Sequence, residues 1–341
     1  MILMLLLSCS RSGTDTASTP PDRAEALARL AEDFALANYT EFALRAAALS
    51  DAAAVLCAAP SSASLVAARE AWWDARAPWK RNEIIQFGPA VEYPERLGPK
   101  LDDWPVSADA VEALIASDTA LDFTLMGTAT RGLPVVEYLL WGSGEASLAV
   151  LSDTPRRCAV LAGAAADVHG NAVILSSVWQ EDWMGALSTP TDDGPYSTQQ
   201  AVLDEWVNRM VFSVENLRAT RLGKPLGDLS GGEVLPDTLE SRPSGRSLTD
   251  AADVLAGVDA VWHLGIRGLV DDDLAEGIDG LLATSAARLA AIPEPLEEAI
   301  VLEPEVVVYT QDALQALQVA LQVDLAQALA VTITFNDNDG D

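Results

Sequence analysis

Apolar side chains recur every three or four residues along most of this chain, whereas the alternating pattern of a half-buried strand is scarce. Residues 22–59 show the helical spacing clearly, through Leu27, Leu30, Phe34 and Phe42. Such spacing places the apolar side chains on one face of a helix, which needs another element to cover it. The pattern therefore predicts an all-α protein of long antiparallel helices.

Capping residues, prolines and glycines set the limits of the predicted helices. Ser61 or Ser62 caps the second helix. A capping box of Ser197 and Gln200 begins a later helix, which Gly223 ends. Beyond residues 22–59, helices are predicted at 62–87, 108–116, 134–140, 155–183, 198–221, 248–265, 272–291 and 310–329.

The predicted helices fall into two sets of similar size. With 341 residues, half of them apolar, the chain can form one large core or two medium ones. We expect an N-terminal helical half at residues 22–150 and a C-terminal half at 151–335. The two halves are predicted to be helical bundles, related by duplication, that form one unit.

The N-terminus has the pattern of a bacterial lipoprotein signal. Residues 1–8 are predicted to be a short signal peptide that is cleaved before Cys9, and Cys9 is predicted to be acylated. Residues 9–21 are rich in Ser, Thr, Gly and Pro, as a flexible tether is. The first residues carry no Lys or Arg, so an ordinary cleaved signal and a cytoplasmic start remain alternatives. The prediction places the chain on the periplasmic face of the envelope, held to the membrane by lipid, and Ser10 favours the outer membrane.

Two further cysteines, Cys57 and Cys158, lie in apolar helical contexts. In an oxidising compartment they could pair. Buried free cysteines behave as small apolar side chains, and that environment favours two free thiols over a disulfide.

The charge is strongly acidic, with 51 Asp and Glu against 21 Lys and Arg and a net charge of −30. Such a chain repels phosphates, which excludes nucleic acid as a partner. Cations suit it better, although a solvated acidic surface explains most of the charge. Residues 336–341 form an acidic tail that faintly resembles a calcium loop but lacks its final glutamate, so a frayed terminus explains it more simply.

Residues 131–142 hold the most informative acid of the chain. Gly132 suits a chain reversal, and Pro134 suits the start of a helix because its missing N–H costs nothing there. Glu137 then falls in the first turn, where a carboxylate is favoured, but among apolar neighbours. A lone acid in such surroundings is either paired inside a core or part of a site.

This segment resembles the Gly-x-His-x-x-Glu signature of the imelysin-like family, also classed as M75 peptidases. Pro134 stands at the position of the His, and Glu137 at that of the Glu. The resemblance extends over nearly the whole mature chain. It is carried by the Trp/Arg-rich residues 68–79, Phe87-Gly88-Pro89, 221–227, 240–248 and the ending 335–341.

The resemblance implies a helical two-domain fold, a periplasmic or lipid-anchored location and a role linked to iron uptake. It also implies a metal held by His and Glu and a metallopeptidase activity. Proline has no side-chain donor, so only Glu137 of that ligand pair is retained, and one carboxylate is a poor transition-metal site. A metal ion is thus a candidate cofactor whose ligands the sequence leaves unknown.

A ligand pocket between the halves is predicted from five residues. Arg76 and Glu83 are seven residues apart and share one helix face, and an ion pair of Arg76 with Glu137 is the favoured geometry. Ser244 and Arg246 precede a helix predicted to be capped by Ser247, with donors aimed outward as for an anion. The two histidines, His169 and His263, suit packed or surface positions better than ligand positions.

The sequence thus predicts an envelope lipoprotein that binds a ligand or a partner protein in a cleft between two helical halves. A metallopeptidase is the first alternative, weakened by Pro134, and a non-catalytic envelope scaffold is the second. The pattern leaves the ligand, the partner and the oligomeric state open.

Overall fold

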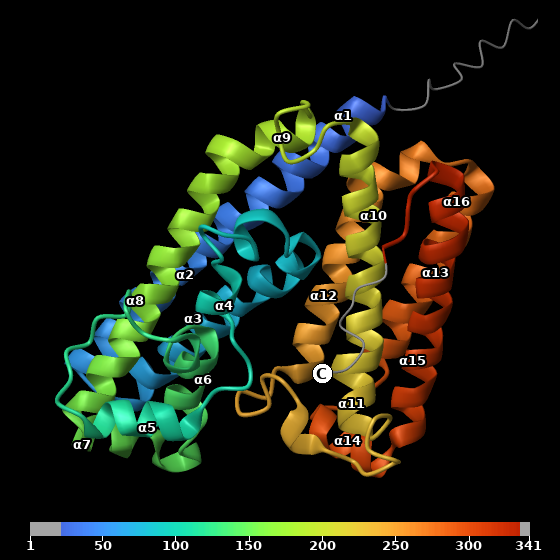
Figure 1. Cartoon of the computed structure of the whole chain (residues 1–341). Helices are drawn as coiled ribbons and strands as arrows, with labels where there is room; N and C mark the ends of the chain where they lie inside the picture. The colour runs from blue at the N-terminus through green and yellow to red at the C-terminus, as the bar shows by residue number, and fades with distance from the viewer. Residues whose placement is uncertain (1–21, 335–341) are drawn as a thin grey trace, which may run out of the picture.

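The computed structural model describes residues 22–334, which form α-helices joined by short 3-10 and π-helical turns, without a strand in that range (Figure 1). The first group of helices is α1 (Arg23–Arg29), α2 (Ala37–Ala58), α3 (Ser62–Arg81), α4 (Gly98–Leu101), α5 (Ala108–Ala116), α6 (Leu133–Trp141), α7 (Ser147–Asp153), α8 (Pro155–Val178) and α9 (Met184–Ser188). The second group is α10 (Gln199–Asn216), α11 (Lys224–Leu226), α12 (Ser247–Val261), α13 (Asp272–Ala290), α14 (Leu296–Leu302), α15 (Pro304–Val319) and α16 (Ala326–Leu329). The all-α prediction is confirmed.

Several long helices are continuous through a π-helical segment rather than broken. The π-helical segments are Leu30–Leu36, Trp179–Trp183, Leu217–Gly223, Trp262–Ile266 and Ala320–Leu325. The 3-10 turns are Asn82–Ile85, Gly88–Ala90, Thr128–Thr130, Gly144–Ala146, Pro236–Thr238 and Arg267–Leu269. The periodicity predicted the length of these helices well, because the chain stays helical through each π-helical segment.

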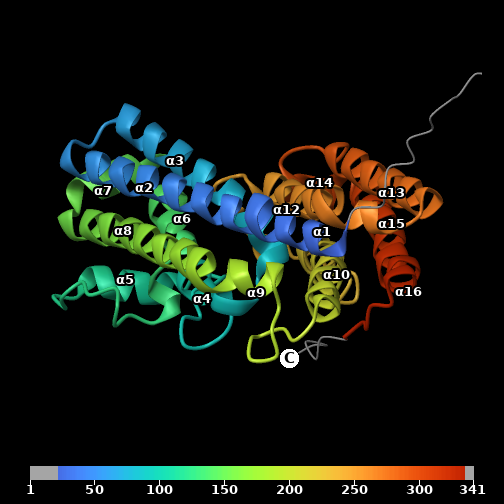
Figure 2. The ribbon, with the colours of Figure 1, turned by 90° about the horizontal axis from the view of Figure 1, so that it is seen from above.

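The helices pack as two bundles, but the boundary lies later than residue 150. Helix α8 runs along α2 and α6, so it belongs to the first bundle (Figures 1 and 2). The second bundle begins with α10, after the loop at residues 189–198. The predicted boundary was wrong because the sequence shows that α8 is apolar but not which neighbours cover it. The stretch Pro155–Ser188 is long and apolar enough to span a membrane, yet half of its most apolar window is buried in the protein, as in a core helix.

Cys57 and Cys158 form a disulfide, with 5.4 Å between their Cα atoms. Cys57 lies at the end of α2 and Cys158 near the start of α8. These two helices pack against each other, which brings the two residues within bonding distance. The expectation of two free thiols was therefore wrong.

The caps confirm one detail of the prediction and correct two. Ser61 forms the capping box of α3 with Ser64, but the cap of α10 is Thr198 instead of Ser197. Gly223 does not end its helix, which continues to Gly227 in the left-handed conformation (φ 108°). A Cβ on Gly223 would lie 2.5 Å from a carboxylate oxygen of Asp228, so this glycine serves close packing.

The bundles meet along α3 and α12 and, at the other end, where α1 packs against α10 and the π-helical segment Trp262–Ile266. The approach is closest at Gly257 of α12, where a Cβ would lie 2.3 Å from the carbonyl oxygen of Arg81. Phe87 packs between the two sets of helices, with its ring centre 5.5 Å from that of Trp179 and 5.7 Å from that of Trp206. The two bundles therefore share one continuous apolar core.

Residues 1–21 and 335–341 lie outside the described part, and with them the predicted signal peptide at 1–8, the tether at 9–21, Cys9 and the acidic tail at 336–341.

Candidate functional site at the junction of the bundles

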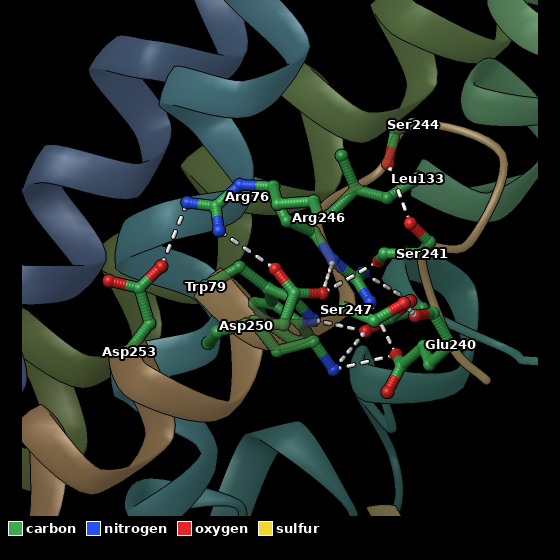
Figure 3. A network of polar contacts seen from close by, with 12 residues as sticks. Arg76, Trp79, Leu133, Glu240, Ser241, Ser244, Arg246, Ser247, Asp250 and Asp253 are labelled. Carbon is green, nitrogen blue, oxygen red and sulfur yellow. Dashed lines mark hydrogen bonds and ion pairs between the residues drawn. The ribbon is translucent and has the colours of Figure 1, made fainter. Parts of the chain in front are cut away.

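A buried network of charged side chains lies where the two bundles meet (Figure 3). The last turns of α3 supply Arg76 and Lys80, and the α4–α5 loop supplies Asp102. From the second bundle, the loop before α12 supplies Glu240, and the first turn of α12 supplies Asp250. The network therefore exists only while the two bundles are packed together.

Arg76 is the centre of this network and is only 1% exposed. Its guanidinium donates to Asp102 at 2.7 Å, to Asp250 at 3.0 Å and to Glu240. Burial alone would lower the pKa of Arg76, but the charges of Asp102 and Asp250 outweigh it and raise the pKa above the ordinary value. The planar donor group of an arginine suits this arrangement, because its nitrogens point in different directions within one plane.

Lys80 lies one helical turn after Arg76 and is also buried. Its ammonium donates to Glu240 at 2.7 Å and lies 3.3 Å from Asp102. Burial and the nearby cations Arg221 and Arg76 lower the pKa of Lys80 to about 8. Burial alone would raise the pKa of Asp102, but Arg76 and Lys80 bring it below its ordinary value.

Arg221 connects Glu83 to the rest of the network. Its guanidinium pairs with both Glu83 and Glu240. Asn216 donates to Glu83 as well, at 3.0 Å. Burial would raise the pKa of Glu83, but Arg221 and Lys80 lower it, so this carboxylate stays charged.

Arg246 forms the ion pairs at the opposite end of the network. It donates to Asp250 at 2.9 Å and to Asp253 at 2.8 Å (Figure 3). Asp250 therefore accepts from Arg246 and from Arg76, and Ser241 donates to it at 2.6 Å. Burial raises the pKa of Asp253 despite its contact with Arg246.

Glu137 differs from these carboxylates because it forms no ion pair with a lysine or arginine within residues 22–334. It is 5% exposed and accepts a hydrogen bond from the backbone N–H of Ser244 at 3.0 Å. Burial raises the pKa of Glu137 to about 7, and Ser244 and the charge of Arg76 offset this only in part. Within residues 22–334, Arg76 forms its ion pairs with Asp102, Glu240 and Asp250, so the expected Arg76–Glu137 pair was wrong.

The turn before α6 fixes the position of Glu137. Gly132 has a φ of 84°, and a Cβ there would lie 2.6 Å from the carbonyl oxygen of Leu101. Helix α6 begins at Leu133, one residue earlier than predicted, with Pro134 in its first turn. Glu137 therefore lies just after the first turn, whereas the sequence predicted it within that turn. The indole N–H of Trp72 donates to the carbonyl of Leu133 at 3.0 Å and ties this turn to α3.

The open cleft expected between the halves is instead a small cavity. It has a volume of about 80 Å³ and lies beside Arg221 and Glu240. It is lined by Trp104, Asn216, Thr220, Arg221, Thr238, Leu239, Glu240, Ser247 and Leu296. Ion pairs between the bundles fill the rest of the junction, which leaves room for about two or three water molecules or a group of that size.

The structure brings the five predicted residues into one connected set. Arg76, Glu83 and Arg246 belong to the ion-pair network, and Ser244 joins Glu137 to the loop that carries Glu240. Ser247, predicted as a helix cap, instead donates its hydroxyl to the carbonyl of Glu240 at 2.6 Å. The role of these residues in binding stays a prediction.

Sequence reasoning missed six charged members of the network. They are Lys80, Asp102, Arg221, Glu240, Asp250 and Asp253. Lys80 could have been found, because it lies four residues after Arg76 on the same helix face. Asp102 gave no signal within its Pro/Gly-rich loop, and Asp250 lies three residues after Ser247, where an acid is common at a helix start.

Other residues with candidate chemistry lie elsewhere. Arg69 lies over the ring of Trp141, 5.2 Å from its centre, and donates to the carbonyl of Leu140 at 2.7 Å. His263 contacts the carbonyl of Asp259 at 3.0 Å, and His169 is half-buried on α8. Neither histidine joins the junction network.

The residues around Glu137 do not fit a transition metal. Pro134 offers no donor atom, and the oxygens of Asp250 already accept from Arg76, Ser241 and Arg246. Between residues 22 and 334, His, Cys, Asp and Glu side chains form no group of three or more arranged to hold a metal ion. The side chains around Glu137 therefore do not supply the ligands for the metal that the family signature implies.

Comparison with known proteins agrees with the fold and with the sequence motifs. The chain is 28% identical over 282 residues to iron-regulated protein A of Synechococcus elongatus, covering 76% of this chain and 73% of that protein. A crystal structure described as an iron-regulated protein A precursor from Parabacteroides distasonis matches with a TM-score of 0.75 and 18% identity, over 92% of this chain and 97% of that one.

An imelysin-like protein from Psychrobacter arcticum matches with a TM-score of 0.76 and 21% identity, again over 92% of this chain and 97% of that one. The model of the imelysin family, peptidase M75, matches residues 35–327. That match spans most of the sequence and confirms the predicted resemblance. The chain belongs to the imelysin family.

Proposed function

We propose that this protein is a non-catalytic binding protein of the bacterial envelope, linked to iron uptake, that recognises a small polar ligand at the junction of its bundles. The observation that carries the proposal is the small cavity beside Arg221 and Glu240. Its lining combines the charged groups of the network with the amide of Asn216 and the hydroxyls of Thr220, Thr238 and Ser247. A pocket with a few convergent polar groups is the usual form of a small-ligand site.

The link to iron rests on the relatives. The name of the Synechococcus elongatus protein states that it is iron-regulated, and so does the description of the Parabacteroides distasonis structure. The donor set at the junction lacks the ligands for iron itself, because only one carboxylate lines the cavity and Arg221 already binds it. The protein therefore serves iron uptake by binding something other than the bare ion.

The location in the envelope is part of the same proposal. The Cys57–Cys158 disulfide supports it, because disulfides persist in oxidising compartments. The lipoprotein pattern at Cys9 supports attachment to the membrane by acyl groups. Mass spectrometry of detergent-extracted protein should find an acylated Cys9 at the mature N-terminus, and an unmodified Met1 in the cytosol would contradict this location.

Growth under iron limitation tests the function. In a strain that lacks the gene, the wild-type protein should restore growth in the presence of an iron chelator. Thr220→Trp blocks the exposed mouth of the cavity without removing a charge, so it should fail to restore growth. Thr40→Trp, on the exposed face of α2, is the matched control and should restore it. Full restoration by Thr220→Trp would overturn the junction as the binding site.

Metal titrations and peptidase assays test the proposal that the protein is not a catalyst. Wild-type protein should bind zinc and ferrous iron weakly in calorimetric titrations and should cleave no peptide in a metal-dependent way. Pro134→His restores the nitrogen donor three residues before Glu137, at a helix start that accepts most residues. It should raise zinc affinity only if further ligands are available. Tight stoichiometric binding by the wild type would show that other residues had replaced the histidine.

A further inference from the structure

A second and larger site lies away from the junction, between α12 and α13. It is a groove of about 700 Å³ on the second bundle. Its floor is formed by buried aliphatic side chains, which are Leu248, Leu255, Leu282, Leu289 and Ile292. Its walls are mostly exposed alanines, which are Ala252, Ala256, Ala283, Ala286 and Ala290. In Figure 2 both helices lie in the orange part of the second bundle, α12 nearer the middle of the molecule and α13 toward its side.

The shape of the groove suits an α-helix. Helices α12 and α13 are antiparallel neighbours joined by residues 262–271, and the groove runs between them above a floor whose side chains are only 2–9% exposed. From Leu248 to Asp259 the groove follows twelve residues of α12, which is about 16 Å or three turns. Alanine walls let the backbone of a third helix approach to the 8–10 Å that is typical of packed helices, about as close as α12 and α13 themselves can come.

The charges at the groove identify the kind of helix. Asp259 and Asp279 lie at one end, and Glu294 lies at the other. No lysine or arginine lines the groove in the described structure. Arg267 neutralises Asp279 at 2.9 Å, and His263 in the groove lining lies 3.4 Å from Asp259. Neither Asp259 nor Glu294 has a lysine or arginine partner among residues 22–334. An occupant with an apolar face and a basic residue at each end would complement both carboxylates.

The same charges argue against a second copy of this chain as the occupant. The chain carries a net charge of −30, and after Arg246 its only basic residues are Arg267 and Arg288. Two acidic surfaces of this kind repel each other when they are brought together.

We propose that the α12–α13 groove binds an amphipathic helix of a partner protein, with an Ala/Leu-rich face of about three turns and a basic residue at each end. The helix covers the five floor residues and places its cations against Asp259 and Glu294. This interaction is separate from ligand binding at the junction and does not rest on it.

A synthetic peptide tests the proposal with the full-length protein. The probe is a labelled helical peptide of about fourteen residues, with Leu and Ala on one face and Lys at both ends. Fluorescence anisotropy should show saturable binding. The same peptide with Glu in place of Lys should bind at least about tenfold more weakly, because it meets Asp259 and Glu294 with like charges. Equal binding of the two peptides would overturn the assignment.

Two pairs of variants locate the binding. Ala286→Trp fills the groove, whereas Ala287→Trp places the same side chain on an exposed position outside it, so only the first should weaken binding, by at least about tenfold. Asp259→Asn with Glu294→Gln should weaken binding and reduce its salt dependence, whereas Glu276→Gln on the exposed part of α13 should not. An unchanged affinity for Ala286→Trp would overturn the proposal.

Two other occupants give distinct results. If dodecylamine binds to the wild type and the peptide does not, the groove is a site for small amphiphiles and the helix proposal fails. If the protein alone dimerises and Ala286→Trp makes it monomeric, the occupant is a second copy and the proposal fails as well.

Discussion

The junction and the α12–α13 groove use side chains in opposite ways. At the junction, carboxylates and cations from both bundles are buried and bind one another, which leaves a cavity of about 80 Å³. In the groove, about 700 Å³ is open above an aliphatic floor, and two of its carboxylates lack a lysine or arginine partner within residues 22–334. A concentration of charged residues therefore marks the site that holds the fold together, whereas the larger free surface lies where charged residues are few.

This comparison predicts that substitutions at the junction change stability strongly and that those in the groove change binding with little effect on stability.

Arg76→Met should have the largest effect. It leaves the carboxylates of Asp102, Asp250 and Glu240 without their shared cation, and breaking a buried pair in this way costs about 3–5 kcal/mol. Urea denaturation measures the loss. Arg242→Met is the control, because its pairs with Asp237 and Glu297 are exposed and such pairs contribute about 0–1 kcal/mol. Equal losses for the two variants would show that the junction charges are not specially important.

Glu137→Gln should change the pH dependence of stability. The pKa of Glu137 is about 7 in the folded protein and near the ordinary value of 4.5 when unfolded. The protonated form is therefore favoured by folding, and this contribution is complete below pH about 4.5 and is lost as the pH rises through about 7. Between these limits the wild type should lose roughly 3 kcal/mol relative to the variant. Parallel stability curves from pH 4 to 8 would contradict the raised pKa.

Gly132→Ala should be less severe but still destabilising. Its backbone conformation is nearly restricted to glycine, and the added methyl group meets the carbonyl oxygen of Leu101. Strain of this kind costs of order 1–3 kcal/mol. Gly144→Ala is the control, since Gly144 also has a positive φ but open space around its Cβ position. Both variants place an alanine at a positive φ, but only Gly132→Ala adds the close contact. A smaller loss of stability for Gly144→Ala would therefore give the cost of that contact.

Ala286→Trp should have the smallest effect on stability. Ala286 is exposed in the groove, and surface substitutions away from caps and ion pairs usually stay within about 0.5 kcal/mol. Thermal unfolding would check this. A large loss would mean that the groove closes in solution and that α12 and α13 pack more tightly than the structure shows.

The fold could be predicted from the sequence almost completely at the level of single helices. Helical periodicity is a local property, so it located the long helices and even those that continue through a π turn. The placement of α8 failed, because an apolar helix such as Pro155–Val178 does not reveal which bundle covers it. The prediction of two free thiols was wrong for the same reason, since only the packing of α2 on α8 brings Cys57 to Cys158.

The junction was predicted in part. Motif resemblance and helical spacing selected Arg76, Glu83, Glu137, Ser244 and Arg246, all of which lie there. The partners of these residues could not be inferred, because Asp102 and Glu240 come from loops whose path depends on the finished fold. Spacing along one helix identifies a face, but it does not identify the segment of chain that covers that face.

The Cys57–Cys158 disulfide keeps the two pieces of the chain joined after a single proteolytic cut between the cysteines. It closes a covalent ring that contains α3 to α7 and the exposed loop at residues 118–127, which lies between the two cysteines in sequence. A protease that cuts once in that loop breaks the backbone but does not release a fragment. The cleaved chain should migrate as one species on a non-reducing gel and as two pieces after reduction, so single cuts in this ring escape notice unless the thiols are freed.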